Sequence, residues 1–460
     1  MKSFFVFFLA LAMPFFPLPL YAQSGAIDPL FDPGTGVDLA VYSIAIQPNS
    51  QILIGGNFTS FDDVERVNIA RLAASGSRDD TFAPGTAVDG SFPYVNAVAL
   101  QPTGKVLLGG GFTNTASTNL TRLNANGNLD SGFKMVVDDS VNAIAVLADG
   151  SILIGGFFTH VNGQARTGIA RLDSTGAVDL GFNPTLFGGF AAVYSLAVQG
   201  DGKILVGGSF TNVSNSLRTN IARLNTNGTL DATFKPVAVG GGQLSPAVFY
   251  SLALDAQGHV VVGGDFTSVN GSVRTNLARF TSDGSLDSGF NAAAGTDFPV
   301  NSVVLEPYGK ILVAGYFNVV NGVGNNYIAR LHSDGRLDSS FNAGSGASDV
   351  VYSVALQPDG KILVGGAFID FNGSFLSGIA RLQNLVTVSP PQLVNPVFSN
   401  HVFTVSVPTF TGKSYVLQFK NSLSDSSWTS HSPVAGDGTL KALTDPSATV
   451  PGRLYRVAVQ

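Results

Sequence analysis

The stretch VYSVALQPDGKILVGG, residues 351–366, is the clearest of seven copies of one unit. An apolar run opens each copy, and a pair of small residues, usually Gly-Gly, follows fourteen residues later. The runs begin at Val41, Val95, Val141, Val193, Phe249, Val300 and Val351. Repeats of roughly 40–55 residues that are built from short strands are typical of β-propellers, with one copy per blade. We therefore predict an all-β chain that folds as a seven-bladed β-propeller.

Each copy predicts a blade of four antiparallel strands. In the seventh copy the strands are 351–356, 361–368 and 379–382, and a turn at 357–360 separates the first two. The fourth strand of the other copies is a Leu-Asp-x-x-Phe motif, with Arg78 or Val178 in place of Leu in two of them, and the seventh copy lacks it. Residues 27–31, Ile-Asp-Pro-Leu-Phe, supply a matching segment near the N-terminus. We expect this N-terminal strand to complete the last blade and close the ring, which removes exposed strand edges.

Together these motifs resemble the delta-60 repeat family. The resemblance covers about residues 26–385 and rests on the 351–366 stretch, on Ile-Ala-Arg-Leu and on Leu-Asp-x-x-Phe. It implies a bacterial extracellular or cell-surface β-propeller and does not imply one activity or one ligand. The chain departs from the pattern at Ala314, at Thr121 and in its shortened second copy.

Three parts are expected along the chain. Residues 1–22 read as a signal peptide, with Lys2, an apolar stretch and a cleavage site before Gln23, so we expect a secreted or cell-surface protein. Residues 23–385 form the propeller. Residues 386–460 begin with a Pro-Pro linker and then alternate apolar and polar residues in short runs from 392 to 460, which predicts a C-terminal immunoglobulin-like or fibronectin-like β-sandwich. Trp428, the only tryptophan, is expected in its core.

Composition narrows the possible functions. The 460 residues carry a net charge of −6, which argues against a nucleic-acid surface. No cysteine is present, so disulfides and thiolate chemistry are excluded. Apart from the signal peptide, no segment is long and apolar enough to predict a membrane span. We expect a monomer without a cofactor.

Repeated arginines and phenylalanines are interpreted as structural. In the first six copies an arginine precedes an aspartate by eight residues, as Arg171 precedes Asp179, and a hairpin would bring the two charges together. Two phenylalanines recur per copy and are expected in the core between sheets. Among the five histidines, no two share a spacing that would make a metal site or a catalytic base.

One constellation falls outside this structural interpretation. The loops before the first strands carry aspartates, which should meet at one mouth of the channel if these strands are innermost. Two neighbouring loops are long and apolar instead. The candidate ligand-binding residues are Asp38, Asp89, Asp138, Asp139, Asp297, Asp349, Phe187 and Phe190. The alternative is that Asp is simply a common turn residue. A glycan, a protein or a basic ligand would suit this mouth, and Ca²⁺ is a possible ion.

The sequence favours a non-catalytic binding or interaction protein with its ligand site at the channel mouth. The first alternative is an extracellular propeller enzyme that acts on polysaccharide, either a lyase or a glycosidase. Such an enzyme needs converging carboxylates, for which Asp297 with Asp349, or Asp138 with Asp139, are the candidates. The second alternative is a structural spacer of the cell envelope.

Overall fold

The computed structural model describes residues 23–188, 191–236, 239–242, 246–255, 257–290, 295–384, 394–399, 401–409, 414–422, 425, 427–436, 440–448 and 453–459. The predicted signal peptide lies outside these residues. The described chain is all-β apart from one turn of 3-10 helix at Pro307–Gly309. None of its helical residues forms a segment of the length and apolarity that a bilayer crossing requires.

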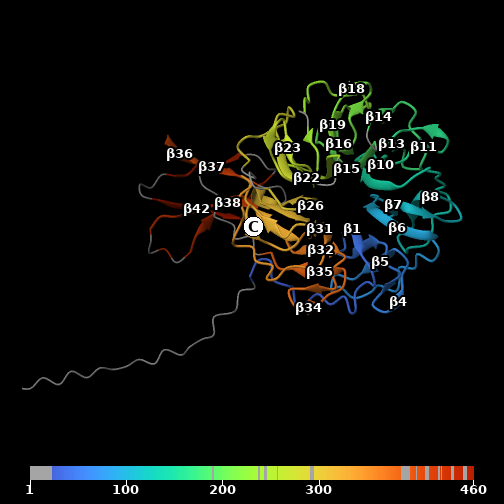
Figure 1. Cartoon of the computed structure of the whole chain (residues 1–460). Coiled ribbons are helices and arrows are strands. Elements are labelled where there is room, and N and C mark those ends of the chain that lie inside the picture. The colour runs from blue at the N-terminus through green and yellow to red at the C-terminus, as the bar shows by residue number, and fades with distance from the viewer. Residues whose placement is uncertain are drawn as a thin grey trace, which may run out of the picture.

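Seven three-stranded antiparallel sheets follow one another along residues 41–382 (Figure 1). The first strands are β1 (Val41–Ile46), β6 (Asp89–Leu100), β9 (Val141–Val146), β15 (Ala192–Val198), β21 (Val248–Leu254), β26 (Val300–Leu305) and β31 (Val351–Leu356). The second strands are β2 (Ile52–Gly56), β7 (Val106–Thr113), β10 (Ile152–Gly156), β16 (Ile204–Ser209), β22 (Val260–Asp265), β27 (Ile311–Gly315) and β32 (Ile362–Gly366). The third strands are β5 (Ile69–Leu72), β8 (Thr118–Leu123), β13 (Ile169–Leu172), β19 (Ile221–Leu224), β25 (Leu277–Phe280), β30 (Ile328–Leu331) and β35 (Ile379–Leu382).

Short hairpins extend six of the sheets after the second strand. They are β3–β4 (Ser60–Phe61, Val64–Glu65), β11–β12 (His160–Val161, Gln164–Ala165), β17–β18 (Asn212–Val213, Ser216–Leu217), β23–β24 (Ser268–Val269, Ser272–Val273), β28–β29 (Val319–Val320, Val323–Gly324) and β33–β34 (Asp370–Phe371, Ser374–Phe375). Two of them gain a third strand, β14 (Leu186–Phe187) or β20 (Val239–Gly240). Four of the turns are Asn-Gly with both residues at positive φ, such as Asn372 and Gly373, which is the geometry of a tight hairpin.

The first strands lie at the centre of the arrangement. In every sheet the first strand is at an edge, and it contacts the first strand of the next sheet. The series returns on itself, because β31 of the last sheet contacts β1 of the first. Val41 and Phe31 accordingly share one hydrophobic core with Leu363 and Ile379 from the other end of the repeat region.

The expected fourth strand is shorter than the sequence predicted. In each repeat the Leu-Asp-x-x-Phe segment makes a single bridge to the third strand, as Leu230 does with Leu224. The chain then turns, because the Asp231 carboxylate accepts hydrogen bonds from the Thr233 backbone N–H and hydroxyl. An aspartate that bonds two residues ahead favours a turn over a continuing strand.

The glycine pair allows close packing in two directions. A Cβ on Gly55 would lie 2.6 Å from the Val95 side chain of the next sheet. A Cβ on Gly56 would lie 1.9 Å from the Ala40 carbonyl oxygen of its own sheet. The first glycine therefore sets the distance between sheets, and the second lets the first strand approach the second.

The repeated phenylalanines are buried in these cores, as predicted. They are Phe58, Phe112, Phe158, Phe210, Phe266, Phe317, Phe368, Phe31, Phe82, Phe133, Phe182, Phe234, Phe290 and Phe341.

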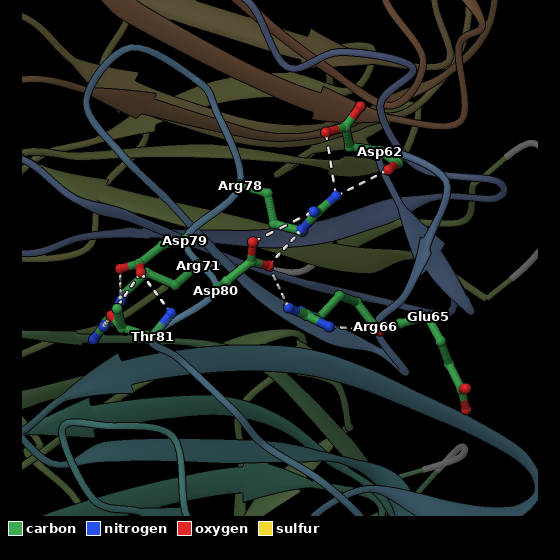
Figure 2. Close-up of polar contacts among 8 residues, drawn as sticks. All are labelled: Asp62, Glu65, Arg66, Arg71, Arg78, Asp79, Asp80 and Thr81. Atoms are coloured by element: carbon green, nitrogen blue, oxygen red, sulfur yellow. Dashed lines mark hydrogen bonds and ion pairs between the residues drawn. The ribbon is translucent and has the colours of Figure 1, made fainter.

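Each repeated arginine joins three elements, and the predicted ion pairs are confirmed. Figure 2 shows the first copy, in which Arg71 Nε lies 2.8 Å from Asp79 Oδ2 and Arg71 Nη2 donates to Thr81. The remaining pairs are Arg122–Asp130, Arg171–Asp179, Arg223–Asp231, Arg279–Asp287, Arg330–Asp338 and Arg381–Asp28. The Arg71 guanidinium also lies over the Phe82 ring, 4.8 Å from its centroid.

The same arginine reaches the next sheet. Arg71 Nη1 donates to the Ala125 carbonyl at 2.6 Å, and Arg122 Nη1 donates to the Ser174 carbonyl at 2.6 Å. The guanidinium thus connects its own third strand, its own turn segment and the neighbouring turn. Because these arginines are nearly buried, each charge depends on the carboxylate beside it.

The N-terminal segment supplies the aspartate and phenylalanine of the last sheet. Ile27 bridges Leu382, and the Asp28 carboxylate lies 2.7 Å from Arg381 Nε and 2.9 Å from Lys361 Nζ. The Phe31 ring lies under the Arg381 guanidinium, 4.8 Å away. Burial opposes ionisation of Asp28, but hydrogen bonds from Lys361, the Leu30 N–H and Arg381 outweigh it and lower its pKa.

Two further sheets occupy the C-terminal part of the described chain. One contains β36 (Val394–Ser399), β37 (Val402–Pro408) and β41 (Leu440–Asp445), and the other contains β38 (Ser414–Lys420), β39 (Thr429–Ser430), β40 (Val434–Ala435) and β42 (Leu454–Val459). Val405, Leu443 and Leu417 bring both sheets into one core. Trp428 was expected there, but it lies partly exposed beneath Arg456, 4.3 Å from the ring centroid.

Replacing Asp28 by alanine should lower the free energy of unfolding by about 3–5 kcal/mol, because Arg381 would stay buried without its carboxylate. Urea denaturation measures this change. Asp359→Ala is the control, since the exposed Asp359 lies 3.9 Å from the same lysine, Lys361. An Asp28 variant as stable as the control would contradict a closing role for the N-terminal segment.

Replacing Gly208 by alanine should destabilise the fold by about 1–3 kcal/mol, the usual cost of overpacking. The new Cβ would lie 2.0 Å from the Ala192 carbonyl oxygen. Gly200→Ala provides a matched control, because a Cβ there meets nothing within 4 Å. Equal melting temperatures for the two variants would show that the glycine pair does not set the strand packing.

Candidate functional site

Each of the seven first strands contains a one-residue bulge near its start. Val41 lies opposite Gly56 and Ser43 lies opposite Gly55, so Tyr42 has no partner across the ladder. The corresponding unpaired residues are Asn96, Asn142, Tyr194, Tyr250, Asn301 and Tyr352. A bulge turns a side chain out of the regular alternation of a strand and is common next to functional sites. Only Tyr and Asn occur at this position.

These seven residues and Tyr316 line one cavity of about 370 Å³. Because the first strands contact one another around the centre, the cavity lies where the seven sheets meet. Its eight lining residues include no Asp, Glu, His, Lys or Arg. The surface of the cavity is therefore aromatic, hydroxyl and amide.

The tyrosines form two groups. The Tyr194 and Tyr250 rings meet edge to face with centroids 5.3 Å apart. Tyr352 meets Tyr42 at 5.0 Å and Tyr316 at 6.0 Å in the same way. The hydroxyls of Tyr316 and Tyr352 are 3.3 Å apart. Contacts of this geometry fix the orientation of the rings without a ligand.

The asparagines separate the two tyrosine groups around the ring. Asn96 and Asn142 come from neighbouring sheets, and the Asn96 amide donates to Asn142 Oδ1 at 2.9 Å. The Asn301 amide lies on the other side of the ring and donates to the Val351 carbonyl at 3.4 Å. Aromatic and amide arcs thus alternate around the cavity.

Burial raises the pKa of four tyrosines of the cavity. Burial, with nearby Tyr194 and Asp265, raises the pKa of Tyr250 to about 12. Burial and the hydrogen bond with Tyr316 raise the pKa of Tyr352, and burial raises those of Tyr42 and Tyr194. The cavity lining is therefore uncharged at neutral pH.

A second position beside the cavity differs in every repeat. The residue that follows the small pair is Asn57, Gly111, Phe157, Ser209, Asp265, Tyr316 or Ala367. Two of these residues pack on the bulged residue of the next sheet, since Phe157 contacts Tyr194 and Tyr316 contacts Tyr352. Seven different side chains at one repeat position contrast with the uniform arginines and phenylalanines of the core.

Three of the predicted aspartates accept hydrogen bonds from a neighbouring loop and so fix its position. Asp38 accepts hydrogen bonds from the Thr59 hydroxyl and from the Thr59 and Ser60 N–H groups. Asp138 makes the same contacts with Thr159 and His160, and Asp297 accepts from the N–H groups of Asn318 and Val319. Burial opposes ionisation of Asp138, but these hydrogen bonds outweigh it and lower its pKa to about 2.

Asp89, Asp139, Asp349 and Phe187 are not part of the cavity lining either. Asp89, Asp139 and Asp349 are exposed, and each accepts a hydrogen bond from the N–H of the following residue. Phe187 lies in β14, at the repeat position of Asp38, and pairs with Asn212 of the short hairpin. Phe190 lies outside the described residues. Within the described chain, no three His, Asp or Glu side chains form a group that could hold a metal ion.

A larger cavity of about 530 Å³ lies at the opposite end of β21 and β26. Two of its charged groups are paired, since His259 Nδ1 lies 2.7 Å from Asp255 and Arg279 Nε lies 2.7 Å from Asp287. Charged groups that are paired with one another are less available to bind a ligand. Glu306 is different, because its buried Oε2 accepts no hydrogen bond within the described chain and lies 3.8 Å from Arg330 Nη1. The central cavity is the better candidate site because the bulged residues of all seven sheets line it together.

The sequence contained a signal for the central cavity that the interpretation above did not use. The second residue of each apolar run is Tyr or Asn in all seven copies, although a strand that faces a core would carry an apolar residue there. Restriction to two polar types at a repeat position indicates a shared polar environment.

Seven segments of the chain match the model of a family described as domain of unknown function (DUF5122) beta-propeller. They are residues 47–82, 101–133, 147–182, 199–234, 258–290, 308–341 and 357–384, just over half of the chain. The chain belongs to this family. Each segment ends in or next to the turn that carries the aspartate and phenylalanine described above, except the last, which is completed by residues 27–31.

Solved structures similar to this DUF5122 propeller are distant. Chaetomium thermophilum Sqt1 is 14% identical over 80% of this chain and 99% of its own, with a TM-score of 0.44. A Bacteroides caccae protein of unknown function is 15% identical over 62% and 91%, with a TM-score of 0.32. A GH43 endo-arabinanase from Bacillus licheniformis is 10% identical over 71% and 98%, with a TM-score of 0.25. No curated protein matches the chain.

Replacing Tyr250 by phenylalanine should flatten the loss of stability between pH 10 and pH 12. The pKa of Tyr250 is about 12 in the folded protein, whereas an unfolded tyrosine titrates near pH 10. As the pH rises through this window the unfolded chain loses the proton first, which favours unfolding. Urea denaturation across the window measures the effect. A slope identical to that of the wild type would show that Tyr250 is not buried in the cavity wall.

Proposed function

We propose that this protein is a secreted or cell-surface seven-bladed β-propeller that binds a ligand, without catalysis, in the central cavity. The seven sheets would be its seven blades, completed by residues 27–31, and the two C-terminal sheets would be an immunoglobulin-like or fibronectin-like sandwich. Under this proposal the chain acts as a monomer. The delta-60 resemblance and the signal peptide at 1–22 are part of the same hypothesis.

One observation supports binding most directly. The seven bulges direct only Tyr and Asn into a single cavity, and Tyr316 joins them there. A purely structural centre would be packed with apolar side chains, which have no unmet hydrogen bonds. Hydroxyl and amide groups around an open space are suited to recognition, because they fix the orientation of a bound molecule. An envelope spacer has no need for such a cavity.

Catalysis on polysaccharide is the weaker alternative. A glycosidase needs two carboxyl groups on either side of the scissile bond, and the eight residues that line the cavity include none. Of the sequence-based pairs, Asp297 with Asp349 and Asp138 with Asp139, the first member of each is engaged with backbone N–H groups of a neighbouring loop. The likeness to an endo-arabinanase has a TM-score of 0.25 and therefore gives no support.

In this proposal the predicted aspartates would affect the ligand through their charge and not through contact. Asp89, Asp139 and Asp349 are exposed; Asp89 is the first residue of β6, and the other two precede β9 and β31. Their charges would make the entrance to the cavity negative, which disfavours anionic ligands. Binding of Ca²⁺ at this rim stays a prediction.

Replacing Tyr352 by alanine should weaken ligand binding at least tenfold, because the variant loses both an aromatic wall and a hydroxyl of the cavity. The measurement is binding of the full chain to immobilised glycans, proteins and basic peptides, with and without Ca²⁺. Phe375→Ala is the matched control, an exposed aromatic in the same repeat but on the outer hairpin. Unchanged binding by the Tyr352 variant, or release of new reducing ends from a glycan, would overturn the proposal.

A further inference from the structure

We infer that the ligand of the central cavity is a neutral saccharide of one or two sugar rings. The inference rests on the proposed function and concerns the chemistry of the same cavity. It follows from the charge of the lining, the arrangement of its groups and its volume.

The uncharged lining of the cavity excludes anionic ligands. None of the eight lining side chains is ionised at neutral pH, because the five tyrosines and three asparagines are all neutral there. An anionic ligand would find no cation, and Asp265 and Asp349 lie close enough to raise the pKa values of Tyr250 and Tyr352. A buried charge without a partner costs several kcal/mol, so acidic sugars and phosphates fit the cavity poorly.

Hydrogen-bond chemistry argues against a simple cation. Tyrosine rings and a negative surrounding could attract a quaternary ammonium group. Such a group has neither donors nor acceptors, whereas the cavity presents tyrosine hydroxyls and the amides of Asn96, Asn142 and Asn301. Binding an ammonium group would leave those polar groups desolvated and unpaired. A polyol satisfies donors and acceptors alike.

The arrangement of the lining matches the two kinds of surface on a sugar. Tyr194 with Tyr250, and Tyr42 with Tyr352, form aromatic arcs on which the C–H face of a pyranose can lie. The Asn96–Asn142 amide pair lies between these arcs and can exchange hydrogen bonds with hydroxyl groups at the ring edge. Because the rings already contact one another, little side-chain entropy is lost on binding.

Volume sets the size of the ligand. The cavity of about 370 Å³ equals roughly twelve liquid waters at about 30 Å³ each. That space suits one or two sugar rings and is too small for a folded peptide. A longer glycan would therefore enter by its end, with the variable side chains Phe157 and Tyr316 beside its first residues.

Calorimetric titration of the full chain with maltose, cellobiose, lactose and xylobiose tests the inference. Sodium glucuronate, glucosamine and tetramethylammonium are the charged counterparts. We expect at least one neutral disaccharide to bind, with an affinity that is insensitive to salt. Tyr352→Phe, which keeps the ring, should weaken it about threefold to tenfold, and Tyr352→Ala more than tenfold. Asn142→Asp should weaken it at least tenfold, because it places a charge in the lining. Phe375→Ala should bind as the wild type does.

Failure of the saccharide inference can be distinguished from failure of the proposed function. If no neutral disaccharide binds, or if tetramethylammonium or glucosamine binds more tightly and loses affinity in salt, the saccharide inference is wrong while the cavity can still be the site. If a disaccharide binds equally well to the wild type and to a folded Tyr352→Ala protein, the site lies elsewhere and the proposed function fails. Thermal melts confirm that each variant is folded.

Discussion

The repeated guanidinium, buried in five of the seven copies, holds the structure together. A single arginine, such as Arg223, pairs with the aspartate of its own turn, lies against the Phe234 ring and donates to a carbonyl of the next sheet. The chain therefore cannot place one sheet correctly without also setting the position of its neighbour. Arg381 makes the corresponding bond from the last sheet to Ala74 of the first, so the series has no free end.

The arginine ion pairs constrain the sequence at one end of the strands. At the other end, the residue at the bulge can differ between repeats. The arginines and their turns are found where the first strands end, whereas the bulges are found where the first strands begin. Mutation at the turn end disturbs a buried ion pair, whereas a change at the bulge alters only the cavity lining. That difference explains how Tyr250 and Asn301 can occupy equivalent backbone positions in adjacent sheets.

The features that could be predicted from the sequence are those that follow from the number of residues between motif positions. An eight-residue separation across a turn was enough to predict Arg171 beside Asp179, and a missing motif was enough to place residues 27–31. The bulge at Tyr42 was missed although it changes the apolar spacing: Val41 and Ile44 both face Gly365, so two residues of one face lie three positions apart instead of two. Aspartates such as Asp38 attracted attention instead, since a loop-holding carboxylate and a ligand-binding one look alike in a sequence.

Where the two ends of the repeat region meet, Arg330 has different hydrogen-bond partners from the other six arginines. Six of the arginines donate Nη1 to a backbone carbonyl of the following turn, whereas the acceptors of Arg330 Nη1 in the described chain are side chains. Arg330 donates instead to the Asn384 side chain at 2.6 Å and to the Ser24 hydroxyl at 2.9 Å. Because Arg330 is fully buried, leaving its Nη1 without these acceptors would be costly even though its Nε stays paired with Asp338. Its hydrogen bonds are completed only when residues from both ends of the repeat region are in place, so closure of the ring and burial of this charge are one cooperative event.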